Sequence, residues 1–217
     1  MLNRETHRLV MFQIIKDIFA SKIWKYLALK WWTACYFLYW LNRFSTDLDF
    51  DLLENIEVDY SLNNILKKYW SIKNGQKIIL SYGEQDINIK IDINKNIWKS
   101  NKYEFINFYG NMIQVQEKST IFANKLVALI ERHTNRDIYD VYFFLQNWFN
   151  VNEDIIFERT WWSLLSLYKK IIVKLEKFPT NYKILEWLWE ILDPKQKIRV
   201  KNKLVSELIW IIKISMM

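Results

Sequence analysis

Hydrophobic residues at helical spacing open the chain. Residues 5–22 carry apolar side chains three and four positions apart, which predicts an amphipathic helix. The segment YLALK at 26–30 is a short apolar run, typical of a buried strand. A short helix is expected from Thr33 to about Trp40. The first forty residues therefore predict a helix, a strand and a second helix.

Strand patterns follow. The segment DLDFDLL alternates charged and apolar side chains from Asp47, as a strand does when one face packs on a core. A helix is predicted at 61–69, and four strands are predicted in KIILSY, INIKIDI, EFINFY and MIQVQ. We expect turns at Gly83 and at the pair Gly110 and Asn111.

After Lys118 the spacing is helical to the end of the chain. Helices are predicted in STIFANKLVALIERH and RDIYDVYFFLQN, and three more at 152–177, 181–191 and 195–213. Strands followed by helices indicate an α+β fold class, with a mixed β-sheet core and a helical C-terminal region. We expect the sheet domain to occupy residues 1–117 and the helical region 118–217.

Composition fits a compact chain with a polyanionic partner. Hydrophobic residues make up 51% and charged residues 25% of the chain, as in globular proteins. The net charge of +7 suits binding to phosphate backbones. Cys35 is the single cysteine, which fits a reducing, cytoplasmic location. Lys30 interrupts the most apolar stretch, YLALKWWTACYFLYWL, so we expect a core element there and no membrane span.

Two aspartates on one strand face are the first candidates for chemistry. Asp47 and Asp49 are two residues apart, so their carboxylates project from the same face while Leu48 and Phe50 pack behind them. Neighbouring carboxylates repel unless a cation lies between them. Mg²⁺, or Mn²⁺, bound by carboxylates and substrate phosphates is a common reason for such a pair. A solvated acidic strand face remains the alternative.

Three further acidic positions and a lysine extend this set. In IKIDIN, Asp92 would become a third carboxylate of a metal site if its strand lay beside the first one; a half-solvated strand is the alternative. Lys125 lies in an apolar helical stretch, which indicates a cation that reaches a phosphate or a lysine that extends to the surface. Asp137 and Asp140 share one face of the next helix, where acidic residues also favour the helix dipole. His133 and Cys35 have no partners at ligand spacing, and we assign them no function.

Five segments in this order resemble the AbiEii-type nucleotidyltransferase toxins of the DNA polymerase β-like superfamily. They are LKWWTACYF, RFSTDLDF, IKIDIN, NKLVAL and RDIYDVYFF, within residues 29–144. The family pattern begins with a Gly-Gly-Thr/Ser turn, continues with an Arg-x-Ser-x-Asp-Leu-Asp-Phe strand and an acidic strand, and ends with lysine and Arg-Asp-x-x-Asp helices. The resemblance implies a nucleotidyltransferase-like sheet.

The resemblance also implies an activity and a role for each residue. A nucleoside monophosphate would pass from an NTP to an RNA, with tRNA 3′ ends the expected acceptor and translation arrest the outcome. Asp47 and Asp49 would hold Mg²⁺, Asp92 would be a third ligand or a base, and Lys125 would neutralise phosphate charge. The residues that would bind the nucleotide are Trp31, Trp32, Thr33, Arg43, Ser45, Asp137 and Asp140. The partner protein would be a cognate antitoxin, a DNA-binding repressor in related systems.

Tryptophans replace the glycines of the first motif. Trp31 and Trp32 stand where the family has its glycine pair, and Trp40 also falls where a glycine is usual. Glycine lets backbone amides approach the triphosphate, whereas an indole fills that space. The chain has 12 tryptophans and 3 glycines, against about 15 glycines expected at this length.

We therefore hypothesise that many of these tryptophans are glycines in the organism, encoded by TGA under a code that reads it as glycine. The pairs Trp161/Trp162 and Trp187/Trp189 look similar. If the codons are TGG, an inactive homologue is the alternative. A nucleic-acid-binding module with exposed stacking aromatics, or a membrane-surface protein using ELIWIIKISMM, would also explain the aromatic content, but neither explains the ordered acidic motifs.

Overall fold

The computed structural model describes most of the chain, in two compact units. The described residues are 3–69, 71–73, 78–82, 87–132, 134–179, 182–186, 188 and 191–217. The first unit, here the sheet unit, comprises Met1–Trp40, Phe44–Ile97 and Lys102–Gln116. The second, here the helical unit, comprises Leu41–Arg43, Trp98–Asn101 and Glu117–Met217. The predicted features at Gly83, His133, Trp187 and Trp189 lie outside the described residues.

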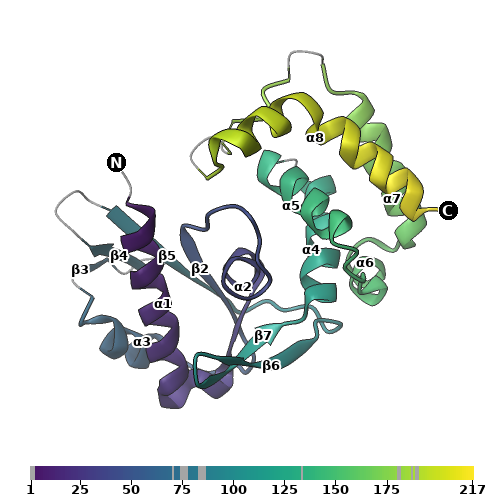
Figure 1. The fold of residues 1–217 in the computed structure, drawn as a ribbon. Coiled ribbons are helices and arrows are strands. Elements are labelled where there is room, and N and C mark those ends of the chain that lie inside the picture. The colour runs from purple at the N-terminus through teal and green to yellow at the C-terminus, as the bar shows by residue number, and fades with distance from the viewer. Residues whose placement is uncertain are drawn as a thin grey trace. The chain divides into compact units, whose positions relative to one another are not determined.

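One mixed sheet contains the seven strands of the described residues, in the order β3-β4-β5-β2-β1-β7-β6 (Figure 1). The pairs β2 with β5 and β1 with β7 are parallel, and the other neighbours are antiparallel. The strands are β1 (Leu27–Leu29), β2 (Asp47–Leu52), β3 (Ser71–Lys73), β4 (Ile78–Tyr82), β5 (Ile87–Asn94), β6 (Tyr103–Phe108) and β7 (Asn111–Gln116).

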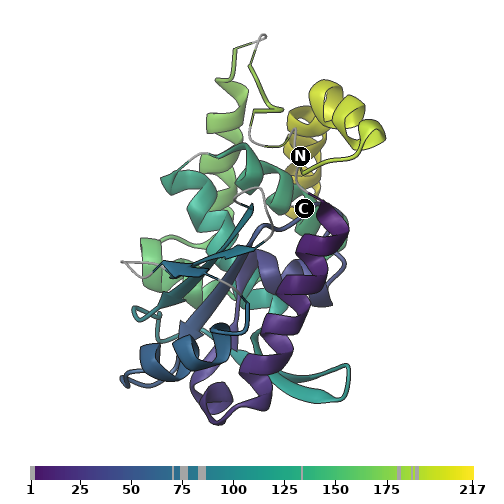
Figure 2. The same ribbon diagram turned by 90° about the vertical axis from the view of Figure 1, so that its left-hand side faces the viewer.

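The apolar face of β2 is covered by the first helix. Leu48 and Phe50 are fully buried, and the ring of Phe50 lies 6.3 Å from that of Phe19 on α1 (Arg4–Ala20). Burying side chains of this size stabilises the fold by about 1.5–3 kcal/mol each. In Figure 2, α1 and α3 (Asp59–Leu66) lie over the sheet. The short helices η1 (Lys22–Tyr26) and α2 (Trp31–Leu38) flank β1.

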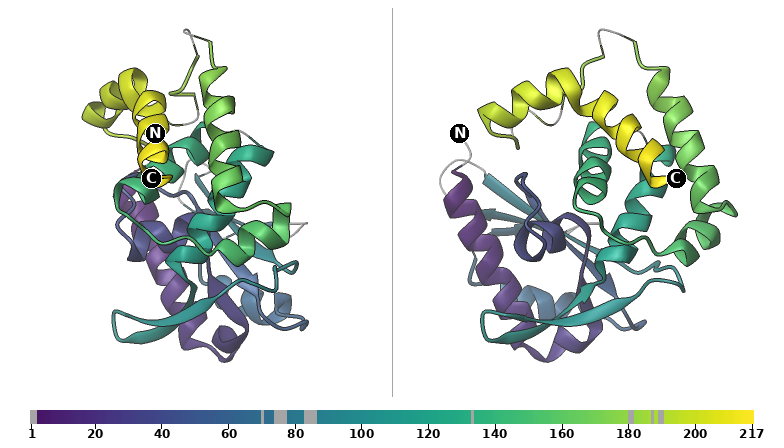
Figure 3. Two further views of the ribbon diagram at one scale, coloured as in Figure 1. Left: turned by 90° about the vertical axis from the view of Figure 1, so that its right-hand side faces the viewer. Right: turned by 45° about the vertical axis from the view of Figure 1, so that its right-hand side comes forward.

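The described residues of the helical unit form five helices. They are α4 (Lys118–Glu131), α5 (Asn135–Gln146), α6 (Glu153–Thr160), α7 (Leu164–Glu176) and α8 (Pro194–Ser215). Figure 3 shows α8 lying across α5 and beside α7. Asp193 and Gln196 form a capping box at the start of α8, with Pro194 at the first helical position, where proline is preferred. None of the helices in the described ranges is long and apolar enough to cross a membrane.

The α+β class is confirmed, and three local predictions are wrong. The helix predicted at 152–177 is two helices, because Trp161 has a left-handed φ of 59° that ends α6 and Ser163 caps the start of α7. Within 181–191 the described residues form turns rather than a continuous helix. The hairpin between β6 and β7 turns at Tyr109 and Gly110, since Asn111 already pairs with Phe108.

Candidate active site

The parallel pairing of β2 with β5 brings two of the predicted carboxylates together. Asp49 is the register partner of Asp92, and Asp47 is the partner of Lys90. Register partners in neighbouring strands project from the same face of a sheet. Asp49 is 9% exposed, while the Asp92 side chain is 33% exposed and lies 4.0 Å from the Lys90 ammonium. The adjacency that the Asp92 prediction required is therefore present.

Two hydroxyls hold the backbone around Asp47. The Thr33 hydroxyl on α2 donates to the Asp47 carbonyl at 2.8 Å and accepts from the Asp49 amide at 3.2 Å. The Ser45 hydroxyl lies 3.5 Å from the same carbonyl. Thr33 and Ser45 are both buried. Their observed contacts position the carboxylate strand, and their binding of a nucleotide stays a prediction.

A third aspartate on this face is part of a buried polar cluster that sequence reasoning missed. Asp51 accepts hydrogen bonds from the Lys30 ammonium at 2.8 Å, the Tyr103 hydroxyl at 2.9 Å and the Asn94 amide at 3.0 Å. The Gln116 amide lies 3.4 Å away. Removing one partner of such a buried pair costs about 3–5 kcal/mol. The signal was available, since Asp51 continues the Asp47 and Asp49 alternation.

The turn after β1 contains Trp31 and Trp32, two of the predicted nucleotide-binding residues. Trp31 is the first residue of α2 and has a left-handed φ of 49°. The Lys30 ammonium lies 4.5 Å from the centroid of the Trp31 ring. Trp32 is partly exposed, and Trp40, after the end of α2, also has a left-handed φ of 54°.

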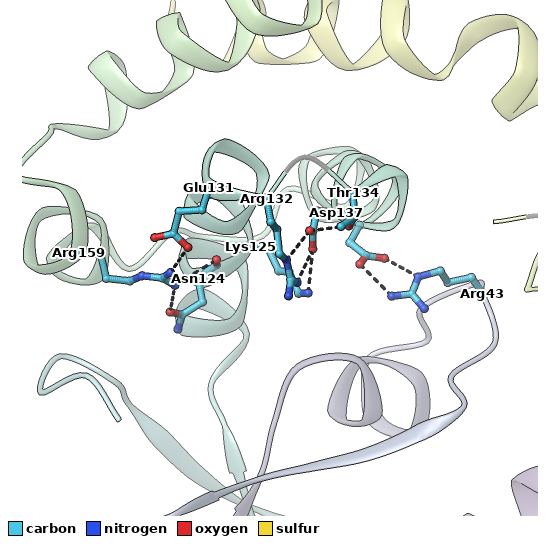
Figure 4. Close-up of polar contacts among 9 residues, drawn as sticks. Arg43, Asn124, Lys125, Glu131, Arg132, Thr134, Asp137 and Arg159 are labelled. Atoms are coloured by element: carbon cyan, nitrogen blue, oxygen red, sulfur yellow. Dashed lines mark hydrogen bonds and ion pairs between the residues drawn. The ribbon is translucent and has the colours of Figure 1, made fainter. Parts of the chain in front are cut away.

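In the helical unit, Asp137 is the centre of a buried ionic cluster (Figure 4). Its carboxylate accepts from the Lys125 ammonium at 3.1 Å and from two Arg132 nitrogens at 2.8 and 2.9 Å. The Thr134 hydroxyl donates to it at 2.6 Å, and the Asp137 amide returns a bond to that hydroxyl. Lys125 is 1% exposed, so it does not extend to the surface.

Burial and pairing shift the pKa values of this cluster in opposite directions. Burial lowers the pKa of the Lys125 ammonium to about 8, against the opposing effect of Asp137 and Asp140. Burial also acts to raise the pKa of the Asp137 carboxyl, but Lys125, Arg132 and Thr134 outweigh it and hold that pKa well below its usual range. At neutral pH the pair is therefore an ammonium and a carboxylate.

Asp140 has a different partner. The Arg43 guanidinium donates to its two oxygens from Nε at 2.7 Å and from Nη2 at 2.9 Å. The Arg43 side chain is 2% exposed and that of Asp140 is fully buried. Burial raises the pKa of the Asp140 carboxyl, and the guanidinium opposes this effect. The structure thus separates the two acidic residues of the Arg-Asp-x-x-Asp motif, because Asp137 contacts Lys125 while Asp140 contacts Arg43.

Arg132, Thr134 and Arg159 were not singled out from the sequence. Thr134 caps α5 and binds Asp137 three residues later, a spacing that marks helix starts and was readable in the sequence. Arg159 on α6 donates to the Asn124 side chain at 2.7 Å and to Glu131 at 2.7 Å (Figure 4). No local pattern predicts this contact, because it joins residues 35 positions apart.

The donor chemistry of β2 and β5 fits Mg²⁺. Asp47, Asp49 and Asp92 offer carboxylate oxygens, and Mg²⁺ is usually bound by one or two carboxylates with waters and phosphates completing its shell. Among the described residues, no group of three or more His, Cys, Asp or Glu side chains is placed so that it could hold a metal ion. Metal binding by these residues stays a prediction.

Comparison with known proteins gives one family and several similar folds. The family model described as "Nucleotidyl transferase AbiEii toxin, Type IV TA system" matches residues 33–162, more than half of the chain. JHP933 from Helicobacter pylori is 22% identical with a TM-score of 0.69, covering 100% of this chain and 93% of that one. MenT4, a nucleotidyltransferase toxin from Mycobacterium tuberculosis H37Rv, is 13% identical with a TM-score of 0.57, covering 96% and 82%. No curated protein matches. The nucleotidyltransferase-like fold is thereby confirmed.

Proposed function

Because the chain belongs to the nucleotidyl transferase AbiEii toxin family, we propose that it transfers a nucleoside monophosphate from an NTP to an RNA, with the 3′ end of tRNA as acceptor. The observation that carries this proposal is the register of β2 and β5. It sets Asp49 beside Asp92, with Asp47 two residues away on the same face.

The three aspartates and Thr33 of the sheet unit each have a role in this proposal. Asp47 and Asp49 would hold Mg²⁺, which would neutralise charge on the phosphates. Asp92 would be a third ligand or would accept the proton of the attacking hydroxyl. Thr33 supports the proposal by fixing the backbone of both Asp47 and Asp49, which preorganises the two carboxylates.

The helical unit would contribute a cation and its support. Lys125 would offset charge that develops on the phosphates, and Asp137 keeps it protonated by direct contact at 3.1 Å. Asp140 would act indirectly by holding Arg43 in place, because both of its oxygens accept hydrogen bonds from the Arg43 guanidinium. Arg43 lies four residues before Asp47 in the chain.

Charge distribution supports RNA as the acceptor. The helical unit has 18 basic and 12 acidic residues, which is +6 of the chain's +7. Residues 194–203, at the start of α8, contain five lysines and arginines and no acidic residue. Basic clusters gain from counterion release on a phosphate backbone. We expect binding of tRNA to weaken steeply with salt.

Transfer of label tests the activity. Purified protein is incubated with each labelled NTP, Mg²⁺ and total tRNA, both as the present sequence and with glycine at residues 31, 32 and 40. We expect the glycine form to label tRNA and its Asp49→Asn variant to lose the activity. Asp59→Asn, the same change at an exposed helix start, is the matched control and should stay active. Equal transfer by Asp49→Asn would disprove the proposed site.

The biological outcome follows from the family. Blocking tRNA 3′ ends would arrest translation, so expression of the active form should stop growth unless an antitoxin is present. A DNA-binding repressor encoded beside the toxin is the expected antitoxin. Growth arrest that persists in an Asp49→Asn strain would separate toxicity from nucleotide transfer.

A further inference from the structure

Left-handed backbone in this protein is concentrated at tryptophan. Five non-glycine residues of the described chain have a positive φ, namely Trp31, Trp40, Tyr109, Trp148 and Trp161. Only a few per cent of non-glycine residues adopt this conformation, and they are mainly Asn, Asp and His. For a bulky residue it costs about 1–2 kcal/mol relative to glycine. Four of five such sites being tryptophan calls for a physical reason.

Trp148 occupies a position that helices usually give to glycine. The Phe149 amide donates to the Phe144 carbonyl at 3.1 Å and the Trp148 amide to the Leu145 carbonyl at 3.1 Å. A six-to-one bond around a left-handed residue is the Schellman motif, which ends α5 here. Glycine is the preferred residue at its left-handed position because it has no Cβ. The sequence pattern alone had not singled out Trp148.

Two more tryptophans end helices in the same way. Trp161 follows the last residue of α6 with φ 59°, and its amide donates to the Phe157 carbonyl at 2.8 Å. Trp40 follows Tyr39, the C-terminal cap of α2, with φ 54°. Both match the left-handed glycine that commonly follows a helix. Trp31, with φ 49°, differs because it opens α2 in the turn after β1.

Burial does not compensate for this strain. None of the nine tryptophans in the described ranges is buried, although tryptophan is highly buried on average. Trp40, Trp148 and Trp161 are 86%, 74% and 75% exposed. A surface that stacks nucleic-acid bases would account for exposure, but not for left-handed backbone beneath the rings. Glycine at these positions accounts for the left-handed backbone, and it leaves no large apolar side chain exposed to solvent.

We infer that the protein made in its own host has glycine at positions 31, 40, 148 and 161. The codons at these positions would be TGA, read as glycine in the host, and give tryptophan only under a code that reads TGA as tryptophan. The backbone argument is independent of the proposed activity. Its consequence for the nucleotide rests on that activity: glycine at position 31 would remove an indole from the turn between β1 and Thr33, and its amide would be open to a phosphate.

Stability of single variants tests the backbone argument. We expect Trp31→Gly, Trp40→Gly, Trp148→Gly and Trp161→Gly each to raise Tm by about 2 °C, because relief of strain exceeds the entropy cost of glycine. Trp210→Gly is the matched control: it is 64% exposed within α8 and absent from the left-handed set. There glycine should lower Tm by about 2–4 °C. A drop at the four sites equal to the control would overturn the inference.

Identity of the residues is tested directly in the host. Trypsin cleavage after Lys30 and Arg43 releases one peptide with residues 31–43, whose fragment-ion masses distinguish glycine from tryptophan at positions 31 and 40. We expect glycine masses and TGA codons. Tryptophan masses or TGG codons would refute the inference. Glycine masses together with an inactive native protein would instead refute the proposed transfer and leave the inference standing.

Discussion

Removing Arg43 should leave a buried charge without its partner. Arg43 and Asp140 have side chains 2% and 0% exposed, joined by hydrogen bonds of 2.7 and 2.9 Å. In Arg43→Met the apolar stem is retained but the Asp140 carboxylate loses its guanidinium. Breaking a buried ion pair on one side costs about 3–5 kcal/mol. We expect a loss of this size in the free energy of unfolding, measured by urea denaturation.

The double variant distinguishes an unpaired charge from lost packing. In Arg43→Met with Asp140→Leu no buried charge remains, and apolar replacements of buried ion pairs are commonly neutral or stabilising. Most of the lost stability should therefore return. The surface control is Lys213→Met, because the side chains of Lys213 and its partner Glu176 are 53% and 49% exposed. An exposed pair contributes about 0–1 kcal/mol.

Acid should also rescue the single variant. Burial already raises the pKa of Asp140, and loss of Arg43 removes the largest effect that opposes this rise, leaving the smaller one of Lys125. A carboxyl with a raised folded pKa favours folding below its unfolded pKa of about 3.9, and this contribution is lost as pH rises through the folded pKa. The deficit of Arg43→Met should thus shrink as pH falls. A deficit under about 1 kcal/mol, or a double variant as unstable as the single one, would refute the reasoning.

Three further predictions concern the polar contacts. Thr33→Val removes the hydroxyl that bonds Asp47 and Asp49, and should cost about 1–3 kcal/mol in urea unfolding, with Thr33→Ser much milder; equal losses would contradict this. The pKa of Asp137 is lowered in the folded protein, so its contribution to stability is present above the unfolded pKa of about 3.9 and is lost as pH falls from there through the folded pKa. Asp137→Asn should therefore make the free energy of unfolding depend less steeply on pH in acid. An unchanged pH dependence would count against the cluster. Nucleotide transfer should decline as pH rises through about 8, where Lys125 loses its proton, whereas Lys125→Arg should keep its activity; a flat profile would exclude a role for the ammonium.

Periodicity located most elements but not their ends. Alternation in DLDFDLL marked β2, and helical spacing marked α1, α4 and α5, because these patterns repeat within a few residues. The break at Trp161 was not predicted from periodicity, because tryptophan as such carries no signal for left-handed backbone, although the pair Trp161/Trp162 is among the suspected glycines. The predicted turn at Gly110 and Asn111 lies one residue after the observed turn at Tyr109 and Gly110. Strand pairing, and not residue type alone, decides where the hairpin turns.

The carboxylate residues were identifiable from their types and spacing, and so was membership of a nucleotidyltransferase family. What the sequence determined by itself was local: that Asp47 and Asp49 share a face, and that Asp137 and Asp140 share another. Which partner each acid takes was decided only by tertiary structure. Strand register sets Asp49 beside Asp92. Tertiary packing brings Asp137 into contact with Lys125 and Asp140 into contact with Arg43. Such contacts join residues far apart in the chain, and no short-range pattern encodes a distance between them.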